Sequence, residues 1–570
     1  MATLRGGFRA LPWANQLLAY QRASWKCASC KVAGSAAFRS ARRYTTTSEG
    51  ASSKPYYVTT PIFYVNAAPH VGHLYSMVIA DVLKRWRTLL GDNNVQLLTG
   101  TDEHGMKIQQ AASAAGMDTQ AFCDMNCKTF QDLAKAAEVD YNHFIRTTDP
   151  AHKEAVQYFW EMLQHRGYIY TAKHEGWYSV SDETFYPQSQ VHLSLDPATG
   201  EKRMVSIETG KEVEWSSETN YHFRLSAFQD RLLELYKTGF IAPSHYRHSV
   251  VKAVSSGLSD LSISRPAERL TWGISVPGDN TQTIYVWLDA LVNYLTKAGY
   301  PFPPGEGARL GWPADVHVVG KDIVRFHCVY WPAFLMALDL PLPRNVLVHG
   351  HWTMNREKMS KSTGNVVNPF FAIDRFGVDV MRFFLTYQGG FTSDADYDNA
   401  HIIRDYRKYL QQGIGNAAHR SIGCAGGNLR TYIVNATAGN SPATPEDQAY
   451  QSMLEQLPTK VEEHMEKLNP RDALQDIVRA TLKTTKYFHN SAPWKDPEQR
   501  QRVLFNMAEA MRITGILLQP FMPNKAKEVL DLFRVDTSKR NFSAARYASD
   551  PDYGEGVEKK ILFPPLLVEE

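Results

Sequence analysis

Two short motifs, far apart in the chain, carry side chains suited to chemistry on phosphates. Pro69-His70-Val71-Gly72-His73 supplies two imidazoles, and Lys358-Met359-Ser360-Lys361-Ser362 supplies two ammonium groups. Phosphoryl transfer needs donors and cations where negative charge accumulates. Either motif alone is weak evidence, because a lone histidine pair is usually a packed turn and a lone basic loop is usually solvated. Together, and in this order, they predict a site that handles phosphate.

The elements around each motif would position it for that task. Residues 57–60 are rich in strand formers, whereas the apolar residues from 75 to 86 recur with helical spacing. The histidine motif therefore falls where a strand turns into a helix, whose free amides and dipole favour a bound anion. The lysine motif follows a second strand-like run at residues 345–349.

Alternating strands and helices extend from residue 55 to about residue 166 and resume later in the chain. The other runs predicted to continue the strands are residues 95–100, 283–287 and 316–320. This alternation predicts an α/β fold with a parallel sheet that binds ligands at the carboxyl ends of its strands. His70, Asp102 and Lys321 each follow a predicted strand, so we expect them along one crevice.

Two regions depart from the α/β pattern. Residues from about 167 to 240 contain short strands, aromatic residues and turn signals, which predicts an insertion into the α/β domain. From about residue 396 the chain is predicted to be helical, with segments near 446–468, 471–489 and 498–518. We therefore expect a helical bundle after the α/β region.

The first 50 residues have the composition of a mitochondrial transit peptide. They contain eight basic residues and one acidic residue, Glu49, and they lack a compact apolar stretch. A disordered arm that binds RNA is the alternative. Without this segment the chain has 54 basic and 58 acidic residues, a net charge of −4. Nucleic-acid binding would thus depend on local patches and not on the global field.

Cysteine usage and hydropathy limit the remaining classes. Cys27 and Cys30 have the spacing of a metal or redox pair, but they lie within the predicted transit peptide. The other four, Cys123, Cys127, Cys328 and Cys424, offer no second pair for a zinc site and are predicted to be reduced thiols. No run of 18 apolar residues is present, so no transmembrane helix or membrane association is predicted.

The two motifs together resemble the signatures of class I aminoacyl-tRNA synthetases, and residues 55–520 closely resemble methionyl-tRNA synthetases of the bacterial and organellar type. The segments that carry this resemblance are Tyr57-Val58-Thr59-Thr60-Pro61-Ile62-Phe63-Tyr64-Val65-Asn66, Thr101-Asp102-Glu103-His104-Gly105, Asp260-Leu261-Ser262-Ile263-Ser264-Arg265-Pro266, Tyr285-Val286-Trp287-Leu288-Asp289-Ala290, and Gly320-Lys321-Asp322-Ile323 with His327.

The resemblance implies a Rossmann-type catalytic domain, an inserted connective domain and an α-helical anticodon-binding bundle. The boundaries that we expect are 1–50 for the transit peptide, 51–166 and 241–350 for the two halves of the catalytic domain, 167–240 for the insertion, 351–395 for the lysine loop and stem-contact region, and 396–570 for the bundle. It also implies ATP-dependent ligation of methionine to tRNA(Met), and the predicted transit peptide places this activity in the mitochondrial matrix.

Site residues follow from the same resemblance. The implied catalytic residues are His70, His73, Lys358 and Lys361. The implied ATP-binding residues are His70, Gly72, His73, Lys321, Asp322, Lys358, Met359, Ser360, Lys361 and Ser362, with magnesium accompanying ATP. The implied methionine-binding residues are Ile62, Tyr64, Asp102, Arg265, Trp287, Ala290, Leu291, Tyr294, Ile323 and His327. Without the resemblance, Trp287 and Tyr294 would read as a core stripe on a helix.

The helical region carries a second set of implied contacts. Asn416 and Arg420 are four residues apart and would share a helix face. Together with Trp494 they are implied to read the CAU anticodon, whose unstacked bases suit stacking on Trp and hydrogen bonding to Asn and Arg. The alternative for Trp494 is a buried structural residue after a proline.

The chain departs from the family in two places. Many relatives carry a zinc knuckle in the insertion, whereas this chain has no cysteine between residues 128 and 327 and has Tyr178-Ser179-Val180-Ser181-Asp182 at the corresponding place. We therefore expect no structural zinc. Some relatives also carry a C-terminal β-barrel for dimerisation, which this sequence lacks, so a monomer is expected.

Three other functions fit the sequence less well. Another class I synthetase, for cysteine, valine, leucine or isoleucine, is disfavoured by the Trp287–Tyr294 pair and by the anticodon set. A non-catalytic RNA-binding protein would have no reason to keep both phosphate motifs. An adenylyltransferase without a tRNA step would not need the helical region. Amino-acid-dependent pyrophosphate exchange distinguishes these functions directly.

Lys361 generates the first prediction, because its ammonium is expected to meet pyrophosphate mainly as charge develops in the transition state. Lys361→Ala should lower the rate of methionine-dependent pyrophosphate exchange by on the order of 10²-fold. The Michaelis constants for methionine and ATP should change much less. Lys361→Arg should recover only part of the rate. A raised ATP constant with an unchanged turnover number would show instead that the loop is a plain binding element.

Overall fold

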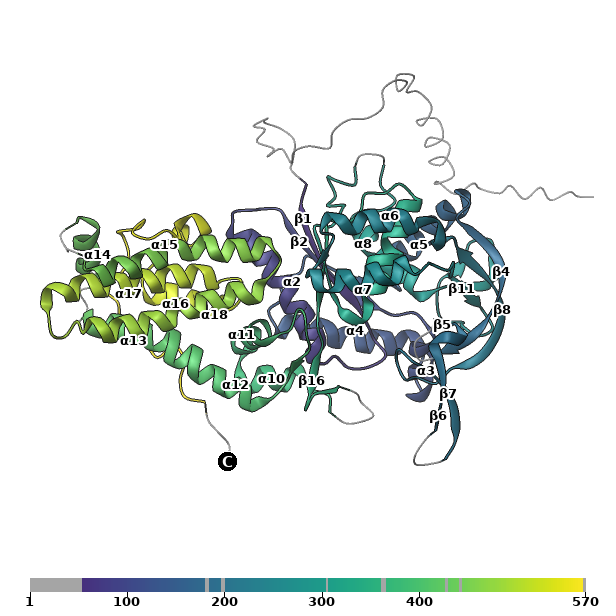
Figure 1. Cartoon of the computed structure of the whole chain (residues 1–570), viewed down its shortest axis with the longest axis horizontal. Coiled ribbons are helices and arrows are strands. Elements are labelled where there is room, and N and C mark those ends of the chain that lie inside the picture. Colours follow the sequence, from purple (N-terminus) through teal and green to yellow (C-terminus); the bar gives the residue numbers. More distant parts are fainter. Residues whose placement is uncertain are drawn as a thin grey trace, which may run out of the picture. The chain divides into compact units, whose positions relative to one another are not determined.

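The computed structural model describes residues 54–179, 184–195, 200–303, 306–359, 365–425, 429–439 and 443–566 (Figure 1). The predicted transit peptide and three residues of the lysine motif, Ser360, Lys361 and Ser362, lie outside these residues.

A six-stranded parallel sheet is the centre of the α/β region. Its strands lie in the order β3-β2-β1-β14-β15-β9, and every neighbouring pair is parallel. The strands are β1 (Tyr56–Tyr64), β2 (Val95–Asp102), β3 (His143–Arg146), β9 (Ile241–Ala242), β14 (Val316–Gly320) and β15 (Asn345–His349). The chain passes outward from β1 in one direction and returns to β14 on its other side, so a topological switch point lies between these two strands.

Helices cover the sheet and connect its strands. They are α2 (Val71–Leu89), α3 (Met106–Ala114), α4 (Thr119–Ala136), α5 (Pro150–His165), α8 (Val286–Lys297) and α9 (Trp331–Ala337). The helical spacing from residue 75 to 86 is confirmed by α2, whose buried residues include Tyr75, Met77, Val78, Val82 and Trp86. His70 directly precedes α2, so the strand-to-helix turn predicted for the histidine motif is confirmed.

The predicted strand at residues 283–287 is wrong in part. Strand β13 (Asp279–Ile284) ends before it, and its neighbours are the antiparallel strands β11 (Ser264–Pro266) and β12 (Ser275–Val276), not the parallel sheet. From Val286 the chain is the helix α8, which is almost wholly buried. A short apolar run at the start of a buried helix has the same sequence appearance as a buried strand.

The insertion is antiparallel. One sheet has the order β10-β8-β4-β5, and a separate hairpin joins β6 to β7. The strands are β4 (Ile169–Ser179), β5 (Thr184–Tyr186), β6 (Val191–Leu195), β7 (Lys202–Ser206), β8 (Glu214–Phe223) and β10 (Leu261–Ser262). Two helices, α6 (Gln229–Leu235) and α7 (Ser244–Ser255), lie between β8 and β10 in the chain. Strand β10 lies beyond residue 240 in the chain, so this sheet draws on residues outside the expected insertion.

A small three-stranded sheet and two helices follow the parallel sheet, and a bundle comes after them. The small sheet is formed by β16 (Trp352–Met354), β17 (Glu357–Lys358) and β18 (Ala395–Asp396), with α10 (Pro369–Phe376) and α11 (Val378–Gln388). The bundle consists of α12 (Asn399–Asp405), a π-helical segment (Tyr406–Gly415), α13 (Asn416–Ala425), α14 (Leu429–Thr437), α15 (Pro445–Glu466), α16 (Pro470–Ser491), α17 (Pro497–Leu518) and α18 (Pro523–Leu532).

The three long helices predicted in the bundle are confirmed by α15, α16 and α17, and each begins with a proline. Proline suits the first helical position because its fixed φ is already helical and its missing N–H has no partner there. In the described parts of the chain, none of the helices combines the length and hydropathy needed to cross a membrane.

Arg382 of α11 connects the helical region to the α/β region. Its side chain is 1% exposed and all three guanidinium nitrogens donate hydrogen bonds. The acceptors are the Asp81 carboxylate of α2 (2.6 Å), the Ala137 carbonyl after α4 (3.2 Å), and the Pro520 and Phe521 carbonyls after α17 (3.0 and 3.2 Å). A buried cation requires such partners, because its desolvation is costly.

Replacing Arg382 tests how much its guanidinium contributes to the stability of the fold. Arg382→Met should lower the free energy of unfolding by about 3–5 kcal/mol, because it leaves the Asp81 carboxylate buried with less compensation. Thermal and denaturant unfolding measure the change. Arg375→Met is the matched control on the neighbouring α10, where Arg375 is exposed, and its effect should stay within about 0.5 kcal/mol. Similar losses in the two variants would contradict the importance given to Arg382.

Candidate active site

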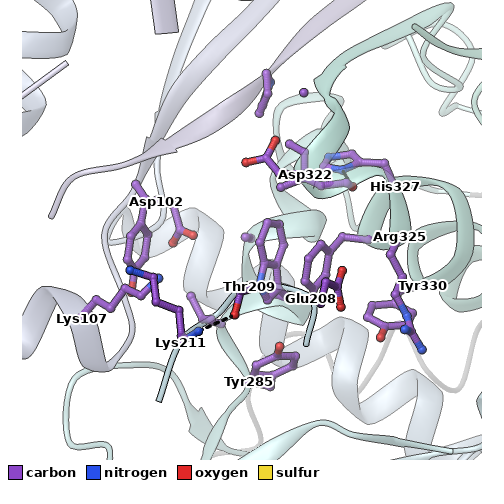
Figure 2. A pocket seen from close by; sticks show the side chains of 18 of the residues that line it. Asp102, Lys107, Glu208, Thr209, Lys211, Tyr285, Asp322, Arg325, His327 and Tyr330 are labelled. Carbon is purple, nitrogen blue, oxygen red and sulfur yellow. Dashed lines mark hydrogen bonds between the residues drawn. The ribbon is translucent and has the colours of Figure 1, made fainter. Parts of the chain in front are cut away.

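One large cavity opens at the carboxyl ends of β1, β2, β14 and β15. Its volume is about 1660 Å³, which exceeds the roughly 300–1000 Å³ typical of a site for one small ligand. Residues from the ends of all four strands line it, and so do residues of the insertion. Figure 2 shows the Asp102 carboxylate at the end of β2 directed into this space. The cavity can therefore hold two small substrates side by side.

The histidine motif forms one wall and caps α2. The Nδ1 atom of His70 accepts a hydrogen bond from the Gly72 amide (3.1 Å), and the Nδ1 atom of His73 accepts one from the His70 amide (3.1 Å). Each ring must therefore carry its proton on Nε2 when neutral. The rings are stacked with centroids 3.8 Å apart. Two Nε2–H donors and the start of a helix thus meet at one place, which suits an anion.

Gly72 is required by this arrangement. A Cβ atom at this position would lie 2.9 Å from Cε1 of the His70 ring. Any other residue would push the His70 ring away from the residue-72 amide, whose hydrogen bond the ring accepts. The His73 ring is held from the other side by Phe63 and Phe130, whose ring centroids are each 5.2 Å away.

A second wall follows β14. Asp322 lines the cavity and accepts a hydrogen bond from Nε2 of His351 (3.0 Å). The Asp322 side chain is 57% exposed, so desolvation by the cavity walls, which acts to raise its pKa, is outweighed. The bond from His351 and the charges of His351 and Lys358 hold the pKa of Asp322 well below its usual range. Lys358 also lines the cavity. The Lys321 ammonium instead forms an ion pair with Asp394 (2.8 Å), and Lys321 is not among the residues that line the cavity.

The predicted methionine residues all line this cavity. They are Ile62, Tyr64, Asp102, Arg265, Trp287, Ala290, Leu291, Tyr294, Ile323 and His327. Tyr294 is buried, as a core stripe would require, but Trp287 is only partly buried and is stacked on Phe326 with centroids 3.6 Å apart. Their common position on the cavity wall favours a binding surface over a simple core stripe. Their roles in binding stay predictions.

His327 is fixed as a neutral acceptor. Its Nδ1 atom lies 2.9 Å from the Ile323 carbonyl and must donate to it, so its Nε2 atom accepts from the Tyr294 hydroxyl (2.7 Å). Burial lowers the pKa of His327 to about 4. The wall that these residues form is therefore uncharged at neutral pH, as a pocket for an apolar side chain requires.

Arg265 lies in a cage of aromatic rings that sequence reasoning missed. Its guanidinium carbon is 5.4 Å from the Tyr178 ring, 5.3 Å from the Phe185 ring and 4.6 Å from the Tyr285 ring. It also donates to the Ser262 hydroxyl (3.0 Å). These rings come from β4, β5 and the residue before α8, so only the pairing of the antiparallel strands brings them together.

The insertion contributes a wall that the sequence did not indicate. Glu208, Thr209 and Lys211, which follow β7, line the cavity together with Arg325 and Tyr330 (Figure 2). Glu208, Lys211 and Arg325 bring both signs of charge to this wall of the cavity. A polar turn without a motif offers no signal by which sequence reasoning could find it.

The predicted anticodon residues form a separate surface on the bundle. Arg420 of α13 contacts His489 and lies over the Phe488 ring at 5.4 Å. Phe488 in turn contacts Trp494, with centroids 5.5 Å apart. Trp494 is 53% exposed, so it is not the buried structural residue considered as the alternative. Asn416 opens α13, one turn before Arg420.

The described residues form no metal-binding site. No group of three or more His, Cys, Asp and Glu side chains there is arranged to hold a metal ion. The four cysteines from Cys123 onward are free thiols, as predicted. Part of the segment that corresponds to the zinc knuckle, residues 180–182, lies outside the described residues, so the absence of zinc stays a prediction.

Comparison with known proteins gives matches over nearly the whole chain. Residues 56–422 match the family described as "tRNA synthetases class I (M)", and residues 437–558 match the "Anticodon binding domain of methionyl tRNA ligase". A Neurospora crassa protein named "Probable methionine--tRNA ligase, mitochondrial" is 50% identical over 573 residues, which cover 96% of this chain and 92% of that protein. The Homo sapiens "Methionine--tRNA ligase, mitochondrial" is 40% identical, with 90% of each chain covered.

Solved structures agree with these matches. The Mycobacterium tuberculosis methionyl-tRNA synthetase in complex with methionyl-adenylate matches with a TM-score of 0.82 and 39% identity, covering 90% of this chain and 100% of that chain. The apo form of the same protein matches with a TM-score of 0.77.

Three buried histidines, of which His327 and His349 line the cavity, make the stability of the fold depend on pH. Burial lowers the pKa of His327 and of His349 to about 4, and that of His317 well below its usual value. The unfolded chain therefore binds more protons below pH 6.5, and stability is lost as the pH falls from about 6.5 toward 4. Each histidine contributes up to about 1.4 kcal/mol per pH unit. Asp379, whose pKa burial raises to about 6, acts with the opposite sign.

Thermal unfolding at pH 7, 6 and 5 measures the sum of the histidine and Asp379 effects. The unfolding midpoint should fall as the pH is lowered. His317→Gln should make this dependence shallower, because it removes one neutral histidine from the interior. His192→Gln is the control, since His192 is exposed on β6. A midpoint that stays constant from pH 7 to 5 would contradict the assignment of three neutral buried rings.

Proposed function

The chain belongs to the methionyl-tRNA synthetase family of class I, and we propose which of its residues carry out the two steps of that family's reaction. The reaction is the ATP-dependent ligation of methionine to tRNA by way of a methionyl-adenylate. One observation carries the proposal. A single cavity holds the histidine motif, Lys358 and the aromatic wall of α8, so it can bring ATP and methionine into contact.

Methionine binding is assigned to the α8 side of the cavity. The Asp102 carboxylate, 7% exposed, would hold the substrate ammonium by a charge-assisted hydrogen bond. Trp287 and Tyr294 would contact the thioether, which is polarizable and favours aromatic neighbours. The neutral His327–Tyr294 pair would close the end of the pocket without offering a charge. Arg265, held in its aromatic cage, would supply a cation to the wall of the same cavity.

ATP binding is assigned to the histidine motif and to the residues after β14. The Nε2–H groups of His70 and His73 would donate to phosphate oxygens, and the first amides of α2 would add to them. Asp322 is ionised and would accept hydrogen bonds from the nucleoside. Lys358, and Lys361 beyond the described residues, would neutralise charge on the departing phosphates.

The first step needs no nucleophile from the protein. An oxygen of the methionine carboxylate attacks the α-phosphorus, the bond from that phosphorus to the bridging oxygen breaks, and pyrophosphate leaves with the electron pair. In the second step the hydroxyl of the terminal adenosine attacks the methionyl carbonyl and AMP leaves. The chain contributes by holding the reacting atoms in line and by placing cations where charge develops.

Magnesium would bind through the substrate. The described residues offer no cage of carboxylates for it, and Mg²⁺ in nucleotide sites is usually held by phosphate oxygens, water and one or two carboxylates. When bound, the ion would neutralise phosphate charge.

Recognition of tRNA is assigned to the bundle. Trp494 presents an exposed ring beside Phe488 and Arg420. Such a cluster can stack one base and donate hydrogen bonds to another. Asn416 lies one helical turn from Arg420 and would read a neighbouring base.

The cell compartment and assembly complete the proposal. The Neurospora crassa and Homo sapiens relatives carry the word mitochondrial in their names, and the Arg-rich N-terminus of this chain has the composition of a transit peptide. We place the chain in the mitochondrial matrix, as a monomer without structural zinc, with the domain boundaries expected from its sequence.

Separating the two steps tests the proposed function. The full chain should catalyse methionine-dependent pyrophosphate exchange. Trp494→Ala should lower aminoacylation of tRNA(Met) by on the order of 10- to 100-fold, since base stacking is worth about 1–3 kcal/mol. Exchange, which needs no anticodon, should change by less than about twofold. Trp494→Phe keeps a ring and should recover part of the loss.

Equal damage to both steps by Trp494→Ala would show a structural Trp. Exchange that depends on another amino acid would overturn the assignment of the pocket.

A further inference from the structure

A buried carboxylate lies directly behind the proposed methionine pocket and has no role in the two steps described above. Asp289 of α8 is 1% exposed. One of its oxygens lies 2.7 Å from Nδ1 of His104, and the other lies 2.7 Å from Nε2 of His152. Burial acts to raise the pKa of Asp289, but the two imidazoles outweigh it and lower the pKa to about 2. The carboxylate therefore stays ionised at any pH at which the protein works.

The two histidines belong to different parts of the fold. His104 is two residues beyond Asp102, in the turn between β2 and α3. His152 is in α5, away from the cavity lining, and its Nδ1 atom lies 3.0 Å from the Thr296 hydroxyl at the end of α8. Asp289 thus ties α8 at one side to the Asp102 turn and at the other side to a covering helix.

The Asp102 turn is also held from its other side. The indole N–H of Trp272 donates to the Glu103 carbonyl (2.6 Å), and the Gly105 amide donates to the Trp272 carbonyl (3.1 Å). The His104 and Trp272 rings are in edge contact at 5.9 Å. With this clamp in place, the His104–Asp289 bond is the side-chain link that sets how far the turn lies from α8.

Helix α8 presents opposite faces to the ligand and to this link. Trp287, Ala290, Leu291 and Tyr294 line the cavity. Asp289 and Thr296, seven residues apart, face away from it toward His152. The link therefore joins the wall that would hold the thioether to the turn that would hold the ammonium.

We propose that His104 and Asp289 are positioning residues that fix the distance between the Asp102 carboxylate and the aromatic wall of α8, and that they thereby select amino acids by side-chain length. This inference rests on the proposed function, in which Asp102 binds the substrate ammonium. The physical basis is that a bond between buried charged groups is short and stiff. A displacement of about 1 Å in a positioned group can cost on the order of 10²-fold in rate.

Loss of His152 is the control that separates an effect on the position of the Asp102 turn from an effect on the stability of the fold. Both histidines donate to the same buried carboxylate at the same distance, so removal of either leaves that carboxylate with one partner fewer. Only His104 is attached to the Asp102 turn. A purely structural cluster would respond alike to loss of either ring.

The experiment compares His104→Leu, His104→Asn and His152→Leu in the full chain. The Asn amide nitrogen occupies nearly the place of Nδ1, so His104→Asn keeps the donor to Asp289, whereas Leu removes it. Pyrophosphate exchange is measured with methionine, with S-methylcysteine, which is one methylene shorter, and with ethionine, which is one methylene longer. Unfolding midpoints are recorded for each variant.

His104→Leu should raise the Michaelis constant for methionine about 10-fold and leave that for ATP within about twofold. It should also reduce the preference for methionine over the two analogues at least about fivefold, out of the 10- to 200-fold that one methylene can provide. His104→Asn should recover most of both effects. His152→Leu should lower the unfolding midpoint while the methionine constant and the preference stay near the wild-type values.

The proposal is overturned if His104→Leu and His152→Leu shift the methionine constant and the preference equally. It is also overturned if His104→Asn, which keeps the donor, behaves like His104→Leu. Should the Leu variant not fold, His104→Gln replaces it, because its longer amide moves the donor away from the Nδ1 position. Asp102→Asn separates failure of the positioning proposal from failure of the proposed function. An unchanged Michaelis constant for methionine in that variant would overturn the proposed function itself.

Discussion

Burial of a single guanidinium constrains the rest of this structure. Arg382 must satisfy its donors without water, and it does so on α2, on the end of α4 and on the turn after α17. Its carboxylate partner, Asp81, also accepts from Arg85 (2.7 Å) and from the Asp140 amide (2.8 Å). Asp81 is eight residues, or roughly 12 Å, along α2 from His73. The axis that places both imidazoles is thereby fixed by contacts far from them.

Neutral imidazoles recur through the site for a related reason. Buried rings lose their charge because desolvation disfavours the imidazolium, and each neutral ring must then divide its two nitrogens between one donor and one acceptor. The buried His327 donates to a carbonyl and accepts from Tyr294. His70 and His73 are only partly buried, and each accepts a hydrogen bond from a backbone amide through Nδ1. Backbone geometry thus decides which nitrogen faces a ligand, so one residue type provides an apolar wall in one place and anion donors in another.

Local patterns in the sequence were sufficient for most of the element types. The start of α2, the strands β1, β2, β14 and β15, and the three long bundle helices could be predicted, because caps, prolines and periodicity act over a few residues. The run predicted as a strand at residues 283–287 is a strand only as far as Ile284, and from Val286 it is helix. Burial of α8 on nearly all sides removes the polar positions that reveal a helix. Lys321 was expected in the crevice, but its ammonium is held by Asp394, 73 residues away in the chain.

The sequence by itself determined which chemical groups are available and where helices and strands would carry them, because a motif and its capping geometry lie within one short segment. The tertiary structure decided which of those groups meet. The cage around Arg265, the stack of Trp287 on Phe326 and the link from Asp289 to His104 join residues from separate elements. The Arg382–Asp81 pair spans 301 residues. Contacts of this kind depend on how whole sheets and helices pack, and no local pattern records that packing.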